Sequence, residues 1–280
     1  KQVFADGWRI YRDYFYVSNI HGVDWDGFRK KYSELLPFVS HRFDLDYIFG
    51  EMIGETNAGH AYSNYGDFEK VKRLETGLLG AKFAADLKNQ RYKFTKIYQG
   101  ENWNPSRRAP LTEQGINVRE GDYLIAIDGI DVTTNENPYK FLENKVNVPV
   151  KITVNSKPSA DGATTYTVKP IASEHELMYL DWVNVRREMV DKLSDGKIGY
   201  MHIPNTSYDG NRELHRGMYA YNDKEALIID DRFNGGGFIP DRMIEIVSRE
   251  TLAKWNVNGL DPMRTPGIAH DGPKVMLINQ

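Results

Sequence analysis

The last third of the sequence alternates short apolar strands with helices, and this alternation constrains the fold more than any other feature. The segments typical of buried strands are KIGYMHI at 197–203, EALIIDD at 225–231 and KVMLIN at 274–279, and those typical of helices are RELHRGMYAY at 212–221 and PDRMIEIVSRE at 240–250. Strands separated by helices in this way predict a parallel sheet with helical crossovers. Sites in such sheets form beyond the carboxyl ends of the strands. We therefore expect a site after the strand at 225–231.

That strand runs directly into a polar turn with three adjacent glycines, Gly235, Gly236 and Gly237. Glycine loses more chain freedom on folding than any other residue, so the run needs a reason. One interpretation is a tight turn into the helix that Pro240 opens. The other is a set of bare backbone N–H groups that approach a substrate carbonyl and favour developing negative charge. A phosphate loop is excluded, because no Gly-Lys-Ser/Thr follows and no GxGxxG pattern opens a helix.

Residues 1 to about 70 are typical of a helical unit. Asp24 is expected to cap one helix that Pro37 ends, and Asp44 to cap a second helix that residues 57–59 end. His60 follows the second helix, where a packed scaffold can hold a side chain in place, and it is the best candidate for a general base. The other histidines have no partner at recognisable spacing and are expected to have surface or packing roles: His21, His41, His175, His202, His215 and His270.

Residues 69–170 change to short strands and turns. Asp128-Gly129 between two apolar runs predicts a hairpin, and residues 148–171 predict another, in which Val150, Ile152 and Val154 oppose Tyr166 and Val168. Residues 139–145 are compatible with a short helix. Together these patterns divide the chain into three parts, with limits at 1–68, 69–170 and 171–280.

Composition excludes several classes of function. The chain has 280 residues, a formal net charge of −3 and interspersed charges, so nucleic acid is not an expected partner. The pairs Arg107-Arg108 and Arg186-Arg187 are expected to lie on solvated faces. The sequence has no cysteine, which excludes disulfides, zinc-thiolate sites and thiol catalysis. It also lacks an HExxH pattern and an apolar run of about 20 residues, so we expect no metal, no cofactor and no membrane span.

Six segments in order resemble one family: GVDWDGFRKKYSELLP, GEMIGETNAGHAYS, GLLGAKF, APLTEQGINVREGDYLIAIDGIDV, KIGYMHIPNTSYDG and LIIDDRFNGGG. They resemble the tricorn proteases, the branch of the C-terminal-processing serine peptidases with an inserted PDZ domain, over essentially the whole chain. The resemblance implies an α+β and α/β multidomain fold, with a helical subdomain, a β-rich PDZ-like domain and an α/β core related to the ClpP/crotonase fold. It implies a serine endopeptidase that acts on peptides or unfolded polypeptides.

The resemblance also assigns roles to residues. His60 matches the general base, and Gly235, Gly236 and Gly237 match the oxyanion loop, with Gly236 the first choice. Gly77, Leu78, Leu79 and Gly80 resemble the loop with which PDZ domains hold a peptide carboxylate, although a plain start of a strand explains them equally well. The family suggests a homo-hexamer for the full protein. The compartment is expected to be cytoplasmic, with the periplasm as the alternative.

Two departures from the family pattern matter. Gly59 stands where the archaeal enzyme has a serine that orients the histidine. The nucleophilic serine of the family follows the strand matched at 274–279, so we expect it, and the acidic member of the triad, beyond Gln280. Ser207 and Ser248 do not lie in the matching turn and are not assigned as nucleophile. On this interpretation the 280 residues are an internal fragment that is inactive alone.

Two other classes of function stay open. The first is a PDZ scaffold that binds peptides and whose peptidase-like core has lost activity, which Gly59 mildly favours. The second is an acyl-CoA enzyme of the crotonase type, which shares the fold and the oxyanion logic. The inserted PDZ-like domain and the absence of a recognisable basic patch for CoA argue against the second class.

Overall fold

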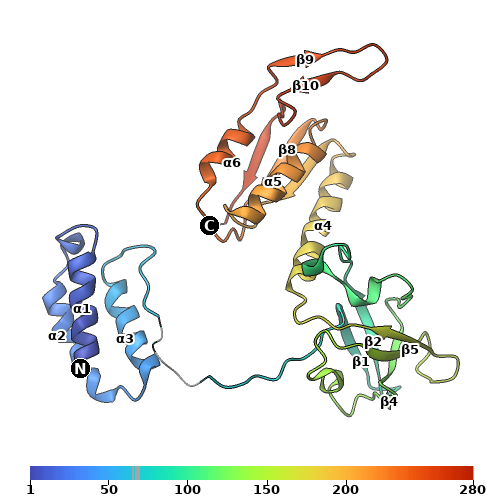
Figure 1. The fold of residues 1–280 in the computed structure, drawn as a ribbon, viewed down its shortest axis with the longest axis horizontal. Coiled ribbons are helices and arrows are strands. Elements are labelled where there is room, and N and C mark those ends of the chain that lie inside the picture. Colours follow the sequence, from blue (N-terminus) through green and yellow to red (C-terminus); the bar gives the residue numbers. More distant parts are fainter. Residues whose placement is uncertain (65, 67–69, 280) are drawn as a thin grey trace. The chain divides into compact units, whose positions relative to one another are not determined.

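The computed structural model describes residues 1–64, 66 and 70–279. It divides into two compact units, residues 1–73 and 74–280, and each is described by itself. Figure 1 shows the helices of the first unit in blue and the sheets and helices of the second from green to red.

The first unit contains the helices α1 (Gln2–Tyr14), α2 (Trp25–Ser33) and α3 (Arg42–Gly54). One apolar core joins them, made of Phe4, Trp8, Ile20, Trp25, Tyr32, Ile48 and Met52. The indole N–H of Trp8 donates to the backbone carbonyl oxygen of Trp25 at 2.9 Å. In return, the indole N–H of Trp25 donates to the backbone carbonyl oxygen of Trp8 at 3.1 Å. The polar atoms of both buried rings are therefore satisfied inside the core.

The ends of α2 and α3 differ in part from the prediction. Asp24 caps α2 as expected, since its carboxylate accepts from the amide of Gly27 at 2.9 Å. However, α2 ends at Ser33, and Pro37 lies in a separate 3-10 turn, Leu36–Phe38. Asp44 is not the N-cap of α3 but its third residue, and its carboxylate accepts from the amides of Ser40 and His41. The helix therefore begins at Arg42, three residues earlier than an N-cap at Asp44 implies, because Asp44 caps it from inside its first turn.

The second unit begins with an antiparallel sheet of six strands in the order β1-β2-β3-β5-β6, with β4 paired to β3. The strands are β1 (Ala81–Asp86), β2 (Arg91–Ile97), β3 (Tyr123–Ile127), β4 (Ile130–Asp131), β5 (Val150–Asn155) and β6 (Thr164–Val168). Both predicted hairpins are present. Asp128 and Gly129 have positive φ angles between β3 and β4, and Ile152 opposes Tyr166 as expected. Residues 138–142 form a 3-10 helix, η5 (Pro138–Leu142).

A parallel sheet of three strands follows, in the order β11-β8-β7, as the alternation predicts. Its strands are β7 (Ile198–His202), β8 (Ala226–Asp230) and β11 (Lys274–Leu277), and its crossover helices are α5 (Tyr208–Ala220) and α6 (Pro240–Val247). The core between sheet and helices includes Met201, Leu214, Leu227 and Ile246. The central strand, β8, is the one that leads into the glycine turn.

Two features of this region were not predicted. A helix of 19 residues, α4 (His175–Leu193), joins the two sheets and contacts both β7 and the 3-10 turn η3 (Pro105–Arg107). A short exposed hairpin, β9 (Ala253–Trp255) with β10 (Met263–Thr265), precedes β11. Among the described residues, no helix combines the length and apolar character that a bilayer crossing requires.

Candidate active site

Asp230 ends the central strand β8 and is completely buried. Its carboxylate accepts from the hydroxyl of Tyr200 at 2.6 Å and from Nε and Nη2 of Arg232 at 2.8 and 2.6 Å. Burial by itself raises the pKa of Asp230, but the hydrogen bonds from Arg232 and Tyr200 outweigh it and lower the pKa to about 2. The Asp230 carboxylate is therefore a fixed charge at the base of the glycine turn.

Acid should weaken the fold through Asp230. Because its pKa falls from 3.8 to about 2 on folding, the stabilisation is complete above the ordinary value and is lost as the pH falls toward the lower one. We expect about 2 kcal/mol of the unfolding free energy to depend on this titration, and Asp230→Asn to lack it. Urea unfolding measured from about pH 5 to about pH 2 tests this. Glu245→Gln, which removes an exposed carboxylate paired with Arg249, is the control. Equal acid sensitivity of the wild type and Asp230→Asn would contradict the assignment.

His202 supports the same turn from the neighbouring strand β7. Its Nε2 donates to the carbonyl oxygen of Arg232 at 2.8 Å, and its Nδ1 lies 2.9 Å from the hydroxyl of Tyr179. A carbonyl oxygen can only accept, so neutral His202 carries its proton on Nε2 and accepts from Tyr179. Both ring nitrogens are engaged, which agrees with a packing role and leaves none free to act as a base.

The glycine turn is held by its own backbone and by Asn234. The amide of Gly235 donates to the carbonyl oxygen of Pro204 at 2.9 Å, and the amide of Gly236 donates to Oδ1 of Asn234 at 2.7 Å. The carbonyl oxygen of Gly236 accepts from the amide of Thr206 at 2.9 Å. Within the described part of the chain, the amide of Gly237 has no acceptor. The turn therefore presents one free N–H group, beside a second that Asn234 occupies.

Each glycine in the turn meets a different constraint. Gly236 has a φ of +79°, which glycine adopts freely and other residues rarely. A Cβ on Gly237 would overlap the backbone carbonyl of Thr206 and would lie 2.8 Å from the amide nitrogen of Ser207. A Cβ on Gly235 would meet only the carbonyl oxygen of Pro204, at 3.8 Å, an ordinary contact. Folding thus explains Gly236 and Gly237, whereas nothing in the fold requires glycine at 235.

An apolar cavity of about 260 Å³ lies beside the turn. Its lining includes Thr206, whose amide bonds the carbonyl oxygen of Gly236, together with Asp231 and the α6 residues Met243, Ile244 and Val247. An apolar side chain of a bound peptide is compatible with this lining.

His60 belongs to the first unit and lies in a turn after α3, with a φ of +60°. Its side chain is exposed, contrary to the expectation of a packed position, because five residues separate it from the end of α3 at Gly54. Its ring meets the ring of Tyr62 edge-on, with centroids 6.3 Å apart. A Cβ on Gly59 would meet nothing within 4 Å, so packing does not dictate the glycine that stands before His60.

The predicted carboxylate-binding loop, residues 77–80, precedes the edge strand β1. The amides of three of its residues, Gly77, Leu78 and Gly80, already have acceptors among the described residues. The amide of Gly77 donates to Leu142, and the amide of Leu78 donates to Ile171, both at 2.8 Å. The amides of Gly80 and Ala81 both donate to Oε1 of Glu174, at 2.7 and 3.1 Å. Sequence reasoning missed Glu174, because 94 residues separate it from Gly80.

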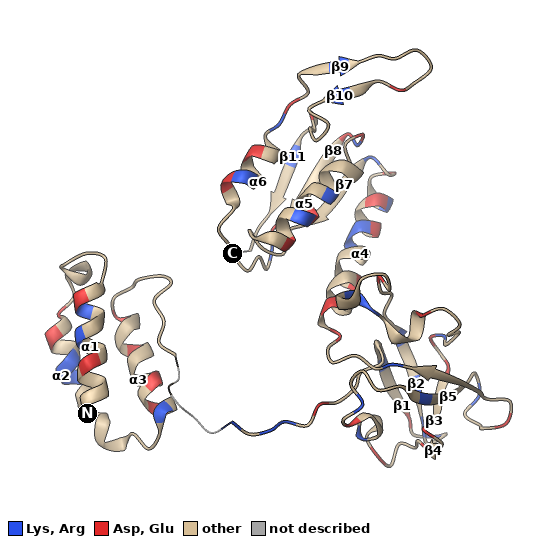
Figure 2. Cartoon of the chain, viewed as in Figure 1, with Lys and Arg blue, Asp and Glu red and all other residues tan. Residues whose placement is uncertain are grey.

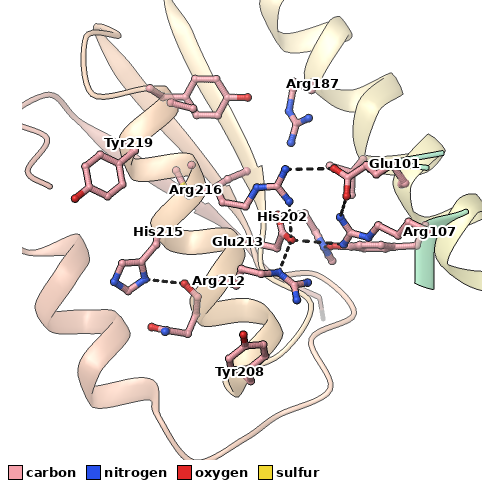
Figure 3. A pocket seen from close by; sticks show the side chains of 18 residues that line it. Glu101, Arg107, Arg187, His202, Tyr208, Arg212, Glu213, His215, Arg216 and Tyr219 are labelled. Atoms are coloured by element: carbon pink, nitrogen blue, oxygen red, sulfur yellow. Dashed lines mark hydrogen bonds and ion pairs between the residues drawn. The ribbon is translucent and has the colours of Figure 1, made fainter. Parts of the chain in front are cut away.

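Arg107 does not lie on a solvated face, as the sequence analysis expected, but is only 4% exposed. It pairs with Glu101 at 3.0 Å and with Glu176 and Glu213 at 3.5 Å, and so ties the six-stranded domain to α4 and α5. Arg107 lines a cavity of about 840 Å³ whose ion pairs are drawn in Figure 3. Burial is possible here because three carboxylates replace the water around the guanidinium. Elsewhere, Figure 2 shows both charge signs mixed on α4 and α5.

The described residues contain no group of three or more His, Cys, Asp or Glu side chains that could hold a metal ion. The site region consists of the ion pair between Asp230 and Arg232, the hydrogen bonds of His202, the glycine turn, and an apolar cavity beside that turn.

Comparison with known proteins identifies the family. Residues 1–54 match the model of the tricorn protease C1 domain, and residues 77–173 match that of the tricorn protease PDZ domain. A tricorn protease homolog of Saccharolobus solfataricus is 36% identical over 246 residues, which cover 88% of this chain and 22% of the relative. Tricorn protease homolog 1 of Streptomyces coelicolor is 32% identical over 283 residues, which cover 100% of this chain and 26% of the relative.

The crystal structure of the tricorn protease superposes with a TM-score of 0.89 at 27% identity, covering 99% of this chain and 27% of that one. The similarity confirms the multidomain fold with its PDZ domain. The chain spans about a quarter of the length of these relatives. It belongs to the tricorn protease family.

Proposed function

We propose that this chain is part of a serine endopeptidase that hydrolyses peptides or unfolded polypeptides, in which His60 is the general base and the turn 235–237 binds the oxyanion. The observation that carries the proposal is Gly235. It follows the carboxyl end of the central strand β8, and its missing Cβ leaves backbone uncovered where folding does not require it. The membership of the tricorn family supports the same chemistry.

The proposed reaction follows the general template of serine peptidases. A serine hydroxyl, which we assign to no serine of this chain, attacks the peptide carbonyl carbon while His60 takes its proton. The negative charge on the carbonyl oxygen is stabilised by N–H groups of the turn. The C–N bond then breaks, His60 gives the proton to the leaving amine, and water releases the acyl group by the same two steps.

Gly236 stays our first choice of oxyanion donor, and the geometry adds a condition. Its amide points to Oδ1 of Asn234 in this structure, so the side chain of Asn234 has to turn away before the amide reaches a substrate. The amide of Gly237, which has no acceptor among the described residues, is the second donor.

The domain limits 1–68, 69–170 and 171–280, a homo-hexameric assembly and a cytoplasmic location complete the proposal. The family resemblance supports the hexameric assembly. The change along the sequence from helical patterns to short strands, and then to alternating strands and helices, supports the domain limits. The absence of cysteine mildly favours a reducing compartment, with the periplasm as the alternative.

Labelling by a fluorophosphonate tests the reaction class. We expect the natural protein that carries residues 1–280 to gain one adduct, on a serine other than Ser207 or Ser248, and to hydrolyse fluorogenic peptides. Intact mass and peptide mapping locate the adduct. A protein without adduct and without turnover would be a binding scaffold, and turnover of acyl-CoA in place of peptides would make it a crotonase-type enzyme. Either result would overturn the proposal.

A further inference from the structure

Two successive amides at the start of β1 hold a carboxylate of the same chain. The N–H groups of Gly80 and Ala81 both point to Oε1 of Glu174, at 2.7 and 3.1 Å. Gly80 has a φ of +76°, which turns the two amides toward one acceptor. PDZ domains hold the C-terminal carboxylate of a peptide on backbone amides in front of an edge strand, and β1 is such a strand here.

The segment before Glu174 also pairs with the loop. Leu78 and Ile171 exchange two backbone hydrogen bonds, of 2.8 and 2.9 Å, in an antiparallel bridge. This bridge lies before β1 and holds the segment that brings the carboxylate of Glu174 to the amides of Gly80 and Ala81, while β1 itself stays an edge strand. We propose that Gly80 and Ala81 form a carboxylate site that Glu174 occupies in the resting protein and that a peptide with a free C-terminus can take over.

The energetics of Glu174 favour exchange. Its side chain is half-buried, and among the described residues it forms no ion pair within 4.0 Å. The charged group that acts on it is Lys82 of β1, and Tyr139 of η5 also interacts with it electrostatically. Burial raises the pKa of Glu174, against the opposing effect of the two amides. The Glu174 carboxylate loses part of its hydration, and this cost offsets much of the stabilisation from its two hydrogen bonds. Glu174 is therefore a weakly held competitor of a peptide carboxylate.

The occupied site lies at the start of a continuous set of contacts that ends at the glycine turn. Glu174 directly precedes α4, and Tyr179 of α4 hydrogen-bonds His202, which in turn holds the carbonyl of Arg232. The ion pairs of Arg107 hold the PDZ domain to α5 independently of Glu174. Exchange at Gly80 and Ala81 therefore frees the residue directly before the helix that supports the turn, while the domains stay joined.

Peptide binding to the 280-residue chain tests the inference by fluorescence anisotropy, with a labelled peptide that ends in a free carboxylate. Glu174→Ala should lower the Kd of this peptide about tenfold or more, because the internal competitor is gone. Glu188→Ala removes an exposed carboxylate from the same helix and should leave the Kd unchanged. The same peptide with an amidated C-terminus should bind all three proteins weakly and equally.

Hydrogen exchange of the Gly80 and Ala81 amides gives a second readout. Both should exchange faster in Glu174→Ala than in the wild type, and the free-carboxylate peptide should slow them again. A folded Glu174→Ala protein with an unchanged Kd, or one that gains equal affinity for the amidated peptide, would overturn the inference. A variant that unfolds would also overturn it, since Glu174 would then be a fixed structural contact. None of these readouts requires peptide hydrolysis, so they stand or fall separately from the proposed function.

Discussion

His60→Asn should lower kcat for peptide hydrolysis by about 10⁴-fold or more, since the base and its nucleophile act as a unit. Asparagine is the sharper choice than alanine, because His60 has a φ of +60° and asparagine tolerates the left-handed region. The side chain is exposed, so its loss leaves no cavity and no buried orphan group. Steady-state kinetics of the natural protein, with thermal unfolding in parallel, measures both effects.

The matched control is His175→Asn, which removes another exposed imidazole, at the first residue of α4. We expect its kcat to stay within about twofold of the wild type, as for a surface substitution. If His60→Asn hydrolyses peptides at the wild-type rate, the general base lies elsewhere and the role assigned to His60 by family resemblance is wrong.

Gly235→Ala and Gly237→Ala should separate a glycine required for function from one required for folding. A methyl group on Gly237 meets the backbone of Thr206 and Ser207, at a φ of +151°. Backbone cannot move aside cheaply, so we expect a loss of about 3 kcal/mol in unfolding free energy. A methyl group on Gly235 finds only an ordinary contact at 3.8 Å, and stability should change by less than about 0.5 kcal/mol.

For peptide hydrolysis we expect the informative variant to be Gly235→Ala, which should stay stable but lose activity. Gly235→Ala should lower kcat/KM by about 10²-fold or more, because the added methyl group covers the backbone where the substrate carbonyl approaches. Urea unfolding and peptide hydrolysis, both at a temperature where each variant is folded, provide the comparison. Full activity in Gly235→Ala would show that the carbonyl does not approach at this residue, and would leave the glycine run as a folding device alone.

The sequence predicted the parts of the fold that local patterns encode. The strands β7, β8 and β11 and their parallel pairing follow from apolar runs separated by helices, and the Asp128-Gly129 hairpin follows from turn chemistry. Helix α4 escaped notice because its apolar residues do not keep to one face: Leu177 and Val183 are buried, whereas Met178, Val185 and Met189 are exposed. A helix between two domains packs on different partners along its length, so its apolar residues do not repeat with the helical period of 3.6 residues.

In the candidate site, too, the sequence predicted local features but not contacts between distant residues. The glycine turn and His60 carry local signals, and the sequence identified them as candidates. The contacts that decide what these groups can do are long-range. Arg107 meets Glu213 across 106 positions of the chain, and Gly80 meets Glu174 across 94. Sequence patterns predict contacts only between residues that are close in the chain. These two pairs form when folded domains pack against each other.

The position of α4 between the two sheets also orders the assembly of the protein on the ribosome. Every strand of the six-stranded sheet lies between Ala81 and Val168, so this domain is complete before the core emerges. The parallel sheet, in contrast, has to wait for β11, whose Lys274 pairs with Leu227 of β8. Contacts that are local in sequence form sooner than distant ones. Glu174 can therefore dock on Gly80 and Ala81 early, and the nascent core then assembles on a helix that is already anchored.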